Sequence, residues 1–282
     1  MHSTWKTVLT TAAIAVLAVA LSGNLPCAWA EEGHESHPGE ARSSTFRLGA
    51  HRLWLFRSFL QDETDDATVL GIEFESYINI GSYQIKNIAY IELADYARAI
   101  PGQPPGTPAT ISGAATGLSD LLTAFLVSKR TAHHGKHHFA PGWAMQFPTA
   151  SDETLGSGKW CIGPSFDYEY ENGSLFAGAI ALQLWSFAGD EDRKDVNMLM
   201  IKPFIVYGIS ERWDLIYMPY GISVYWDKPS GENVYFPLGG GAQYHIPAGS
   251  MEVNLALQFF RNVVRPTKGT VNDLRFLIEL AF

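Results

Sequence analysis

The chain has 282 residues, of which 46% are hydrophobic, 13% aromatic and only 17% charged, and its formal net charge at pH 7 is −9. The negative charge argues against nucleic acid as a partner. The chain lacks repeated apolar runs of about 18 or more residues, which excludes a bundle of transmembrane helices. Its many aromatic and β-branched residues exclude a disordered protein.

The first 30 residues have the order of a secretory signal peptide. Lys6 precedes an apolar run from Val8 to Leu21, and Ala28-Trp29-Ala30 provides a small-x-small cleavage site. Cys27 suggests a lipoprotein signal, but the preceding Pro26 fits one poorly, so we expect cleavage after Ala30. Residues 31–45 are rich in Glu, His, Ser and Gly and lack periodicity, which predicts a flexible periplasmic leader.

Residues 46–282 alternate between apolar and polar residues with a period of two, which is typical of β-strands. Near the C-terminus, for example, Leu274, Phe276 and Ile278 share one face, while Arg275 and Glu279 lie on the other. The pattern predicts an all-β fold, a closed antiparallel transmembrane β-barrel of about twelve strands, with ten as the alternative count. The predicted segments are 46–60, 68–80, 83–96, 118–130, 137–148, 158–171, 174–187, 194–207, 212–226, 233–246, 250–263 and 270–282.

Segment length and aromatic placement favour a membrane barrel over a water-soluble β-domain. Soluble strands average about 5 to 6 residues, whereas a tilted strand that crosses a bilayer needs about 9 to 11. Aromatic residues also gather at segment ends, where interfacial belts are expected. These are Phe147, Trp160, Trp185, Trp213 and Trp226.

The connections predict the orientation and the location of the barrel. Those after odd-numbered segments are mostly longer and polar, and the longest, Pro101 to Gly117, contains four prolines. Those after even-numbered segments are mostly short. Long outside and short inside is the arrangement of the bacterial outer membrane, so lipid is an expected partner. The chain ends in Phe282, and we expect the outer-membrane assembly machinery to recognise this terminal aromatic strand.

Polar residues on the inner faces are candidates for a transport path, and acidic ones outnumber basic ones, which would disfavour anions. A twelve-stranded barrel has a smaller lumen than a 16-stranded porin, so we expect the passage to be narrow or partly plugged by the Pro-rich loop or the leader. The alternative is a sealed structural or interaction barrel without transport. The candidate lumen residues are Glu73, Glu75, Lys86, Glu92, Asp167, Glu169, Gln183, Lys202, Glu252, Gln258, Arg275 and Glu279.

A histidine cluster allows a second interpretation. His133, His134, His137 and His138 fall in or beside a predicted periplasmic turn, and imidazole pairs can hold zinc, copper or nickel. The alternative is a solvated polar turn, because no sulfur or well-spaced carboxylate completes the site. We expect no cofactor. Neither do we expect an enzyme, because no nucleophile with a histidine base stands in a recognisable context.

Several motifs in the last 60% of the chain carry a family resemblance. They are Gly156-Ser157-Gly158-Lys159-Trp160, Trp185-Ser186-Phe187-Ala188-Gly189-Asp190, Pro203-Phe204, Pro237-Leu238-Gly239-Gly240-Gly241 and Asn262-Val263-Val264-Arg265-Pro266. With these motifs the chain resembles the outer-membrane family named for the meta-pathway of phenol degradation, whose members are commonly labelled transporters. The resemblance implies a β-barrel that takes up small, often aromatic, compounds. The three consecutive glycines suggest sharp curvature or close approach of another segment in the lumen.

Overall fold

The computed structural model describes residues 45–59, 66–98, 100, 113–130, 136–248 and 251–281. The predicted signal peptide and nearly all of the predicted leader lie outside the described residues. So do most of the Pro-rich loop, His133, His134 and Phe282.

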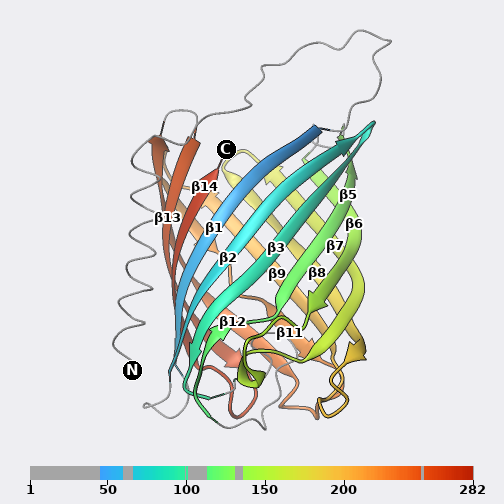
Figure 1. The fold of residues 1–282 in the computed structure, drawn as a ribbon. Coiled ribbons are helices and arrows are strands. Elements are labelled where there is room, and N and C mark those ends of the chain that lie inside the picture. The colour runs from blue at the N-terminus through green and yellow to red at the C-terminus, as the bar shows by residue number, and fades with distance from the viewer. Residues whose placement is uncertain are drawn as a thin grey trace. The chain divides into compact units, whose positions relative to one another are not determined.

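The described chain forms a single antiparallel sheet that closes on itself. β4 and β5 both pair with β3, and β10 and β11 both lie between β9 and β12, so the strands occupy twelve positions around the barrel. β14 pairs with β1 and closes the sheet (Figure 1). The chain is a closed antiparallel β-barrel, and the predicted count of twelve is confirmed. The elements are β1 (Thr45–Phe59), β2 (Asp66–Ile80), β3 (Tyr83–Tyr96), β4 (Ala115–Leu118), β5 (Leu121–Lys129), β6 (His137–Phe147), the 3-10 turn η2 (Glu153–Leu155), β7 (Lys159–Asn172), β8 (Leu175–Gly189), β9 (Asn197–Gly208), β10 (Trp213–Tyr217), β11 (Ile222–Tyr225), β12 (Val234–Ala248), β13 (Met251–Val264) and β14 (Asn272–Ala281).

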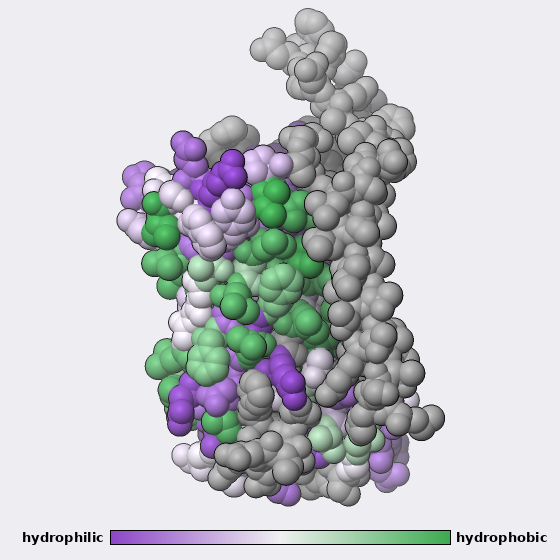
Figure 2. All heavy atoms as spheres, turned by 90° about the vertical axis from the view of Figure 1, so that its left-hand side faces the viewer, coloured by the Kyte–Doolittle hydropathy of each residue, from purple (hydrophilic) through white to green (hydrophobic). Residues whose placement is uncertain are grey.

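The barrel wall has an apolar outer face and a buried inner face, as the alternation predicts. In β7, Trp160, Ile162 and Phe166 are 40 to 43% exposed, whereas Cys161 and Asp167, which have the opposite parity along the strand, are fully buried. Figure 2 shows hydrophobic residues over much of the visible wall, with hydrophilic residues gathered toward its upper and lower ends. Among the described residues, no helix is long and apolar enough to cross a membrane.

The two ends of the barrel differ in their connections. At one end, called here the short-turn end, tight turns such as Gly81-Ser82 and Gly173-Ser174 join the strands, and β1 begins and β14 ends there. At the other end, called the long-loop end, the connections are longer, such as 148–158 and 226–233. Exposed aromatic residues lie at strand ends toward both rims. Trp160 and Trp185 lie near the long-loop end, and Trp213 beside Tyr244 lies near the short-turn end.

Two predicted strands are interrupted in the structure. Segment 118–130 breaks at Ser119-Asp120 because the Asp120 carboxylate accepts hydrogen bonds from Gln146, Ala150 and Ser157. Segment 212–226 breaks at Met218–Gly221, where Pro219 has no N–H for the sheet. Tyr217 pairs with Ile205 of β9, and Ile222 pairs with Ile201. Residues 218–221 therefore stand opposite only residues 202–204, and this longer segment leaves the wall of the barrel.

The glycine run in β12 allows close contact with β13. A Cβ at Gly239 would lie 2.0 Å from the Phe259 carbonyl oxygen, and one at Gly241 would lie 1.9 Å from that of Leu257. Gly240 has a φ of +152°, which other residues rarely adopt. The close contact is therefore with β13, the neighbouring strand of the wall, and not with a segment in the lumen.

This packing predicts a strong effect of one methyl group. We expect Gly241→Ala to lower the free energy of unfolding by about 3 kcal/mol or more, because the new Cβ would force β12 away from β13. Gly208→Ala is the matched control, since a Cβ there would meet no atom closer than 3.6 Å. Denaturant unfolding of the two variants in lipid vesicles measures the difference. Equal stability would contradict the described β12–β13 contact.

Candidate functional site

The centre of the lumen holds an ionic network whose position follows from strand register. Arg52 on β1 lies directly opposite Glu279 on β14 and opposite Glu73 on β2, so all three side chains share the inner face. The Arg52 guanidinium bonds to Glu279, and its Nη1 lies 2.7 Å from the Glu73 carboxylate and 3.5 Å from that of Glu75. One cation therefore links carboxylates from β2 and β14, the two strands that flank β1.

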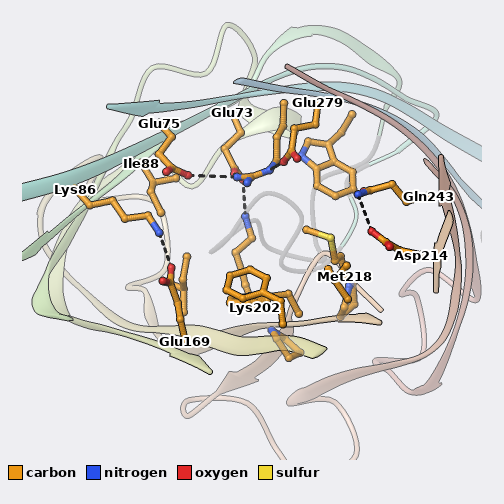
Figure 3. A pocket seen from close by; sticks show the side chains of 18 of the residues that line it. Glu73, Glu75, Lys86, Ile88, Glu169, Lys202, Asp214, Met218, Gln243 and Glu279 are labelled. Carbon is orange, nitrogen blue, oxygen red and sulfur yellow. Dashed lines mark hydrogen bonds and ion pairs between the residues drawn. The ribbon is translucent and has the colours of Figure 1, made fainter. Parts of the chain in front are cut away.

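Two lysines extend this network across the lumen. Lys202 Nζ on β9 lies 3.3 Å from Glu73 Oε2 on β2, on the opposite side of the barrel (Figure 3). Lys86 Nζ on β3 lies 3.2 Å from Asp167 and 2.9 Å from Glu169, both on β7. These bridges narrow the passage, and breaking a buried pair would leave an uncompensated charge.

A cavity of about 430 Å³ surrounds this network. Glu73, Glu75 and Glu279 lie along one wall, while Lys202 projects from the other (Figure 3). Its volume is in the range of small-molecule pockets, about 300 to 1,000 Å³. The lining residues are Arg52, Trp54, Glu73, Glu75, Tyr77, Lys86, Ile88, Glu169, Phe176, Ile180, Lys202, Pro203, Phe204, Val206, Asp214, Met218, Pro219, Gln243, His245 and Glu279.

A second, more open cavity of about 420 Å³ lies at the short-turn end. It shares Phe176, Val206, Asp214 and His245 with the first, so the two cavities adjoin. The His245 imidazole lies between two carboxylates, with Nε2 2.6 Å from Asp214 and Nδ1 in contact with Glu252. The central cavity is therefore approached from the short-turn end.

Toward the long-loop end, apolar side chains pack the lumen. One buried cluster includes Tyr96, Ile100 and Leu155, and another includes Met198 and Tyr235. Tyr220, in the Met218–Gly221 segment, packs against both clusters. The Tyr90 ring meets the Tyr220 ring edge-on at 6.2 Å, and the Arg275 guanidinium lies 5.7 Å from its centre. The Met218–Gly221 segment, called here the inward segment because Met218 and Pro219 line the central cavity, is thus part of a closure between that cavity and the long-loop end.

Contacts between loops and strand ends add to this closure. The Arg193 side chain of the β8–β9 loop donates to the Glu153 and Gly156 carbonyls of the β6–β7 loop. Asp195 of the same loop accepts from Lys159 and Ser186, and these hydrogen bonds lower the pKa of its carboxyl below the usual range. Thr267 donates to Glu232, which joins two further loops.

The structure places most of the candidate lumen residues on the inner face. Six line the central cavity, namely Glu73, Glu75, Lys86, Glu169, Lys202 and Glu279. Asp167 pairs with Lys86, and Glu252 with His245. The buried residues Glu92, Gln258 and Arg275 lie closer to the inward segment, and Gln258 accepts a hydrogen bond from the Met218 N–H at 3.0 Å. They contribute to the closure rather than to the cavity.

The prediction for Gln183 is wrong. Gln183 has the same parity along β8 as Trp185 and Phe187, which are 48% and 62% exposed, so its side chain lies on the outer face. Leu182 and Leu184 occupy the inner face instead. Trp226 Nε1 donates to the Gln183 amide oxygen, and the amide nitrogen donates to Asn197. These contacts satisfy the amide at the barrel rim.

Sequence reasoning missed several residues of the cavity. Arg52 and Asp214 carry a detectable signal, because each is a charged residue inside a predicted strand, and Asp214 lies between the apolar residues Trp213 and Leu215. His245 falls inside the predicted segment 233–246, where a single histidine indicates no role by itself. The apolar members Trp54, Phe176, Phe204 and Met218 carry no such signal, because an inward apolar residue breaks the alternation on which the assignment depends.

The histidine pair that the structure describes does not converge. His137 and His138 are neighbours in β6 and point to opposite faces of the sheet. The His137 Nδ1 lies 3.0 Å from the Tyr168 hydroxyl on the outer face, and the His138 Nδ1 lies 3.6 Å from Glu169 on the inner face. Within the described residues, no group of three or more His, Cys, Asp or Glu side chains could hold a metal ion. The metal site stays a prediction.

Comparisons with known proteins do not assign a family. No family model matches the chain, and no curated protein is similar to it in sequence. The solved structures to which it is similar include the following three. The NanC porin is 11% identical over 82% of this chain and 98% of its own, with a TM-score of 0.47. A Pseudomonas aeruginosa FadL homologue is 10% identical over 83% and 73%, with a TM-score of 0.35. The Ralstonia pickettii toluene transporter TbuX is 10% identical over 86% and 89%, with a TM-score of 0.31. The resemblance to the phenol meta-pathway family stays a prediction.

Proposed function

We propose that this protein is an outer-membrane β-barrel channel for small solutes. The observation that carries the proposal is a cavity of about 430 Å³ inside a closed barrel whose outer face is apolar. A closed barrel leaves no unpaired backbone in lipid. In this proposal the short-turn end is periplasmic and the long-loop end is external, since outer-membrane barrels have short periplasmic turns.

The passage is narrow and selective rather than a wide aqueous pore. Ion pairs cross the centre of the lumen, and the Met218–Gly221 segment and its contacts close it beyond the cavity. The apolar wall of the cavity, including Phe176 and Phe204, supports passage of compounds with an apolar or aromatic body. The motif resemblance to the phenol meta-pathway family agrees with this class of solute. Transport requires no catalytic step and no cofactor.

The channel proposal predicts small cation-preferring currents. We expect the purified protein in planar bilayers to give small conductance steps and a reversal potential in a KCl gradient that favours K⁺, because acidic residues exceed basic ones along the described cavity. Replacing Glu171 and Glu211 at the short-turn end with Gln should lower this preference. Glu153→Gln, at the long-loop end, is the matched control.

Solute uptake into vesicles tests the same proposal without an ion current. We expect the protein to accelerate entry of small aromatic solutes. In the planar-bilayer recordings, a reversal potential that favours Cl⁻ over K⁺ would contradict the role given to the acidic lining of the cavity. Absence of both current and uptake would instead favour a structural or interaction barrel.

A further inference from the structure

The central cavity has two chemically different walls. The side formed by β1, β2 and β14 carries Arg52 with its carboxylate partners. The side formed by β8, β9 and the inward segment is mainly apolar and includes two phenylalanine rings. The Phe176 and Phe204 rings pack with their centres 5.0 Å apart. The apolar lining on this side is Phe176, Ile180, Pro203, Phe204, Val206, Met218 and Pro219.

The basic side chains of the cavity already have anionic partners. Arg52 contacts three carboxylates, Lys86 contacts two, and Lys202 contacts Glu73. An anionic ligand would have to displace one of these carboxylates to reach a cation. Among the described lining residues, five carboxylates face three Lys or Arg side chains and His245, which has a carboxylate at each ring nitrogen, so the lining keeps an excess of at least one negative charge even with His245 protonated.

The approach to the cavity is also acidic. The described lining of the cavity at the short-turn end includes Glu171, Glu211, Asp214 and Glu252 and contains no Lys or Arg. Carboxylates that line a concave, low-dielectric surface concentrate cations there and speed their entry. A solute from the short-turn end would therefore meet negative charge first and the phenylalanine rings next.

We infer that the central cavity binds small organic cations, namely amines with an aromatic or apolar body. This inference rests on the proposed channel function and names its substrate class. The body packs against Phe176 and Phe204, and the ammonium group lies toward the acidic lining of the adjoining cavity at the short-turn end, which includes Glu171 and Glu211. Burial of the apolar body supplies affinity, and the acidic entrance supplies preference for positive charge.

Three probes that share a phenyl ring and differ in charge test the inference. They are 2-phenylethylammonium, 2-phenylethanol and phenylacetate, titrated calorimetrically into the full chain folded in a non-ionic detergent. We expect affinity to fall in that order. We also expect the preference for the ammonium over the alcohol to weaken at high salt, because screening acts on the charged probe alone.

Two pairs of phenylalanines provide matched variants. The Phe176→Ala and Phe204→Ala double variant removes the inner pair and should weaken binding of 2-phenylethylammonium about tenfold or more. The Phe139→Ala and Phe166→Ala double variant removes an outer pair whose ring centres are 6.0 Å apart, and it should leave binding unchanged. The milder Phe204→Leu variant keeps the site testable if the inner double variant fails to fold.

The inference is overturned if phenylacetate binds as tightly as the ammonium probe, if the probe does not bind, or if the inner and outer variants bind alike. Its failure can be separated from failure of the channel proposal. A protein that conducts ions but does not bind the amine remains a channel, and the substrate assignment fails. A protein that binds the amine but supports neither current nor uptake retains the binding site, and the channel proposal fails.

Discussion

Replacing Tyr220 with alanine is expected to raise the conductance of the barrel several-fold. The Tyr220 side chain packs against both apolar clusters between the central cavity and the long-loop end. The segment that carries it is already outside the sheet, so the substitution opens a path without breaking strand pairing. Single-channel recording in planar bilayers measures the change.

Tyr207→Ala is the control for this variant, because Tyr207 is also a tyrosine but is 50% exposed on the outer face of β9. Loss of a large packed side chain can cost up to about 3 to 5 kcal/mol, and Tyr220 is partly buried, so the folded state of its variant must be checked by migration on detergent gels. If both folded variants conduct like the parent, the inward segment does not close the lumen.

The second large effect is expected on the outer face. Leu257, on β13, is 57% exposed and lies opposite Phe276 of β14. Arginine at a lipid-facing site near the bilayer centre costs about 2 to 4 kcal/mol, and near the interface about 0 to 1. We therefore expect Leu257→Arg to destabilise the barrel strongly and Val264→Arg, at the end of the same strand, to do so weakly.

Equilibrium unfolding in lipid vesicles measures both arginine variants. The contrast is informative because an exposed leucine on a soluble protein tolerates substitution within about 0.5 kcal/mol. Small and equal effects at the two positions would mean that this face meets water and that β13 does not cross a bilayer.

The strands, and the face of the wall to which each side chain points, could be predicted because one local rule governs most of the wall. Residues that face lipid must be apolar, so charged residues such as Glu73, Asp167 and Glu279 indicate the inner face wherever they occur. The rule fails at Gln183, a polar residue on the outer face, because the inner face of β8 beside it is apolar as well. There Leu182 and Leu184 face inward, and the amide is satisfied by neighbours on other strands.

The interruptions and the cavity depend on contacts between distant parts of the chain. Asp120 breaks its strand through hydrogen bonds to residues 26 to 37 positions away. Pro219 and Gly221 are a local signal for the second break, but the contacts of Tyr220 with both clusters come from tertiary packing. For the same reason, charge alone could suggest the acidic lumen, whereas the apposition of Phe176 and Phe204 required the register of β8 and β9.

The central claim is that the chain is a closed barrel in the outer membrane, and heat-modifiable migration of the protein recovered from fractionated cells tests it most directly. We expect the protein in the outer-membrane fraction, with an unheated band that migrates differently from the boiled one, because a closed hydrogen-bonded barrel stays folded in detergent until it is heated. Recovery as a soluble periplasmic monomer with a single band would contradict the account.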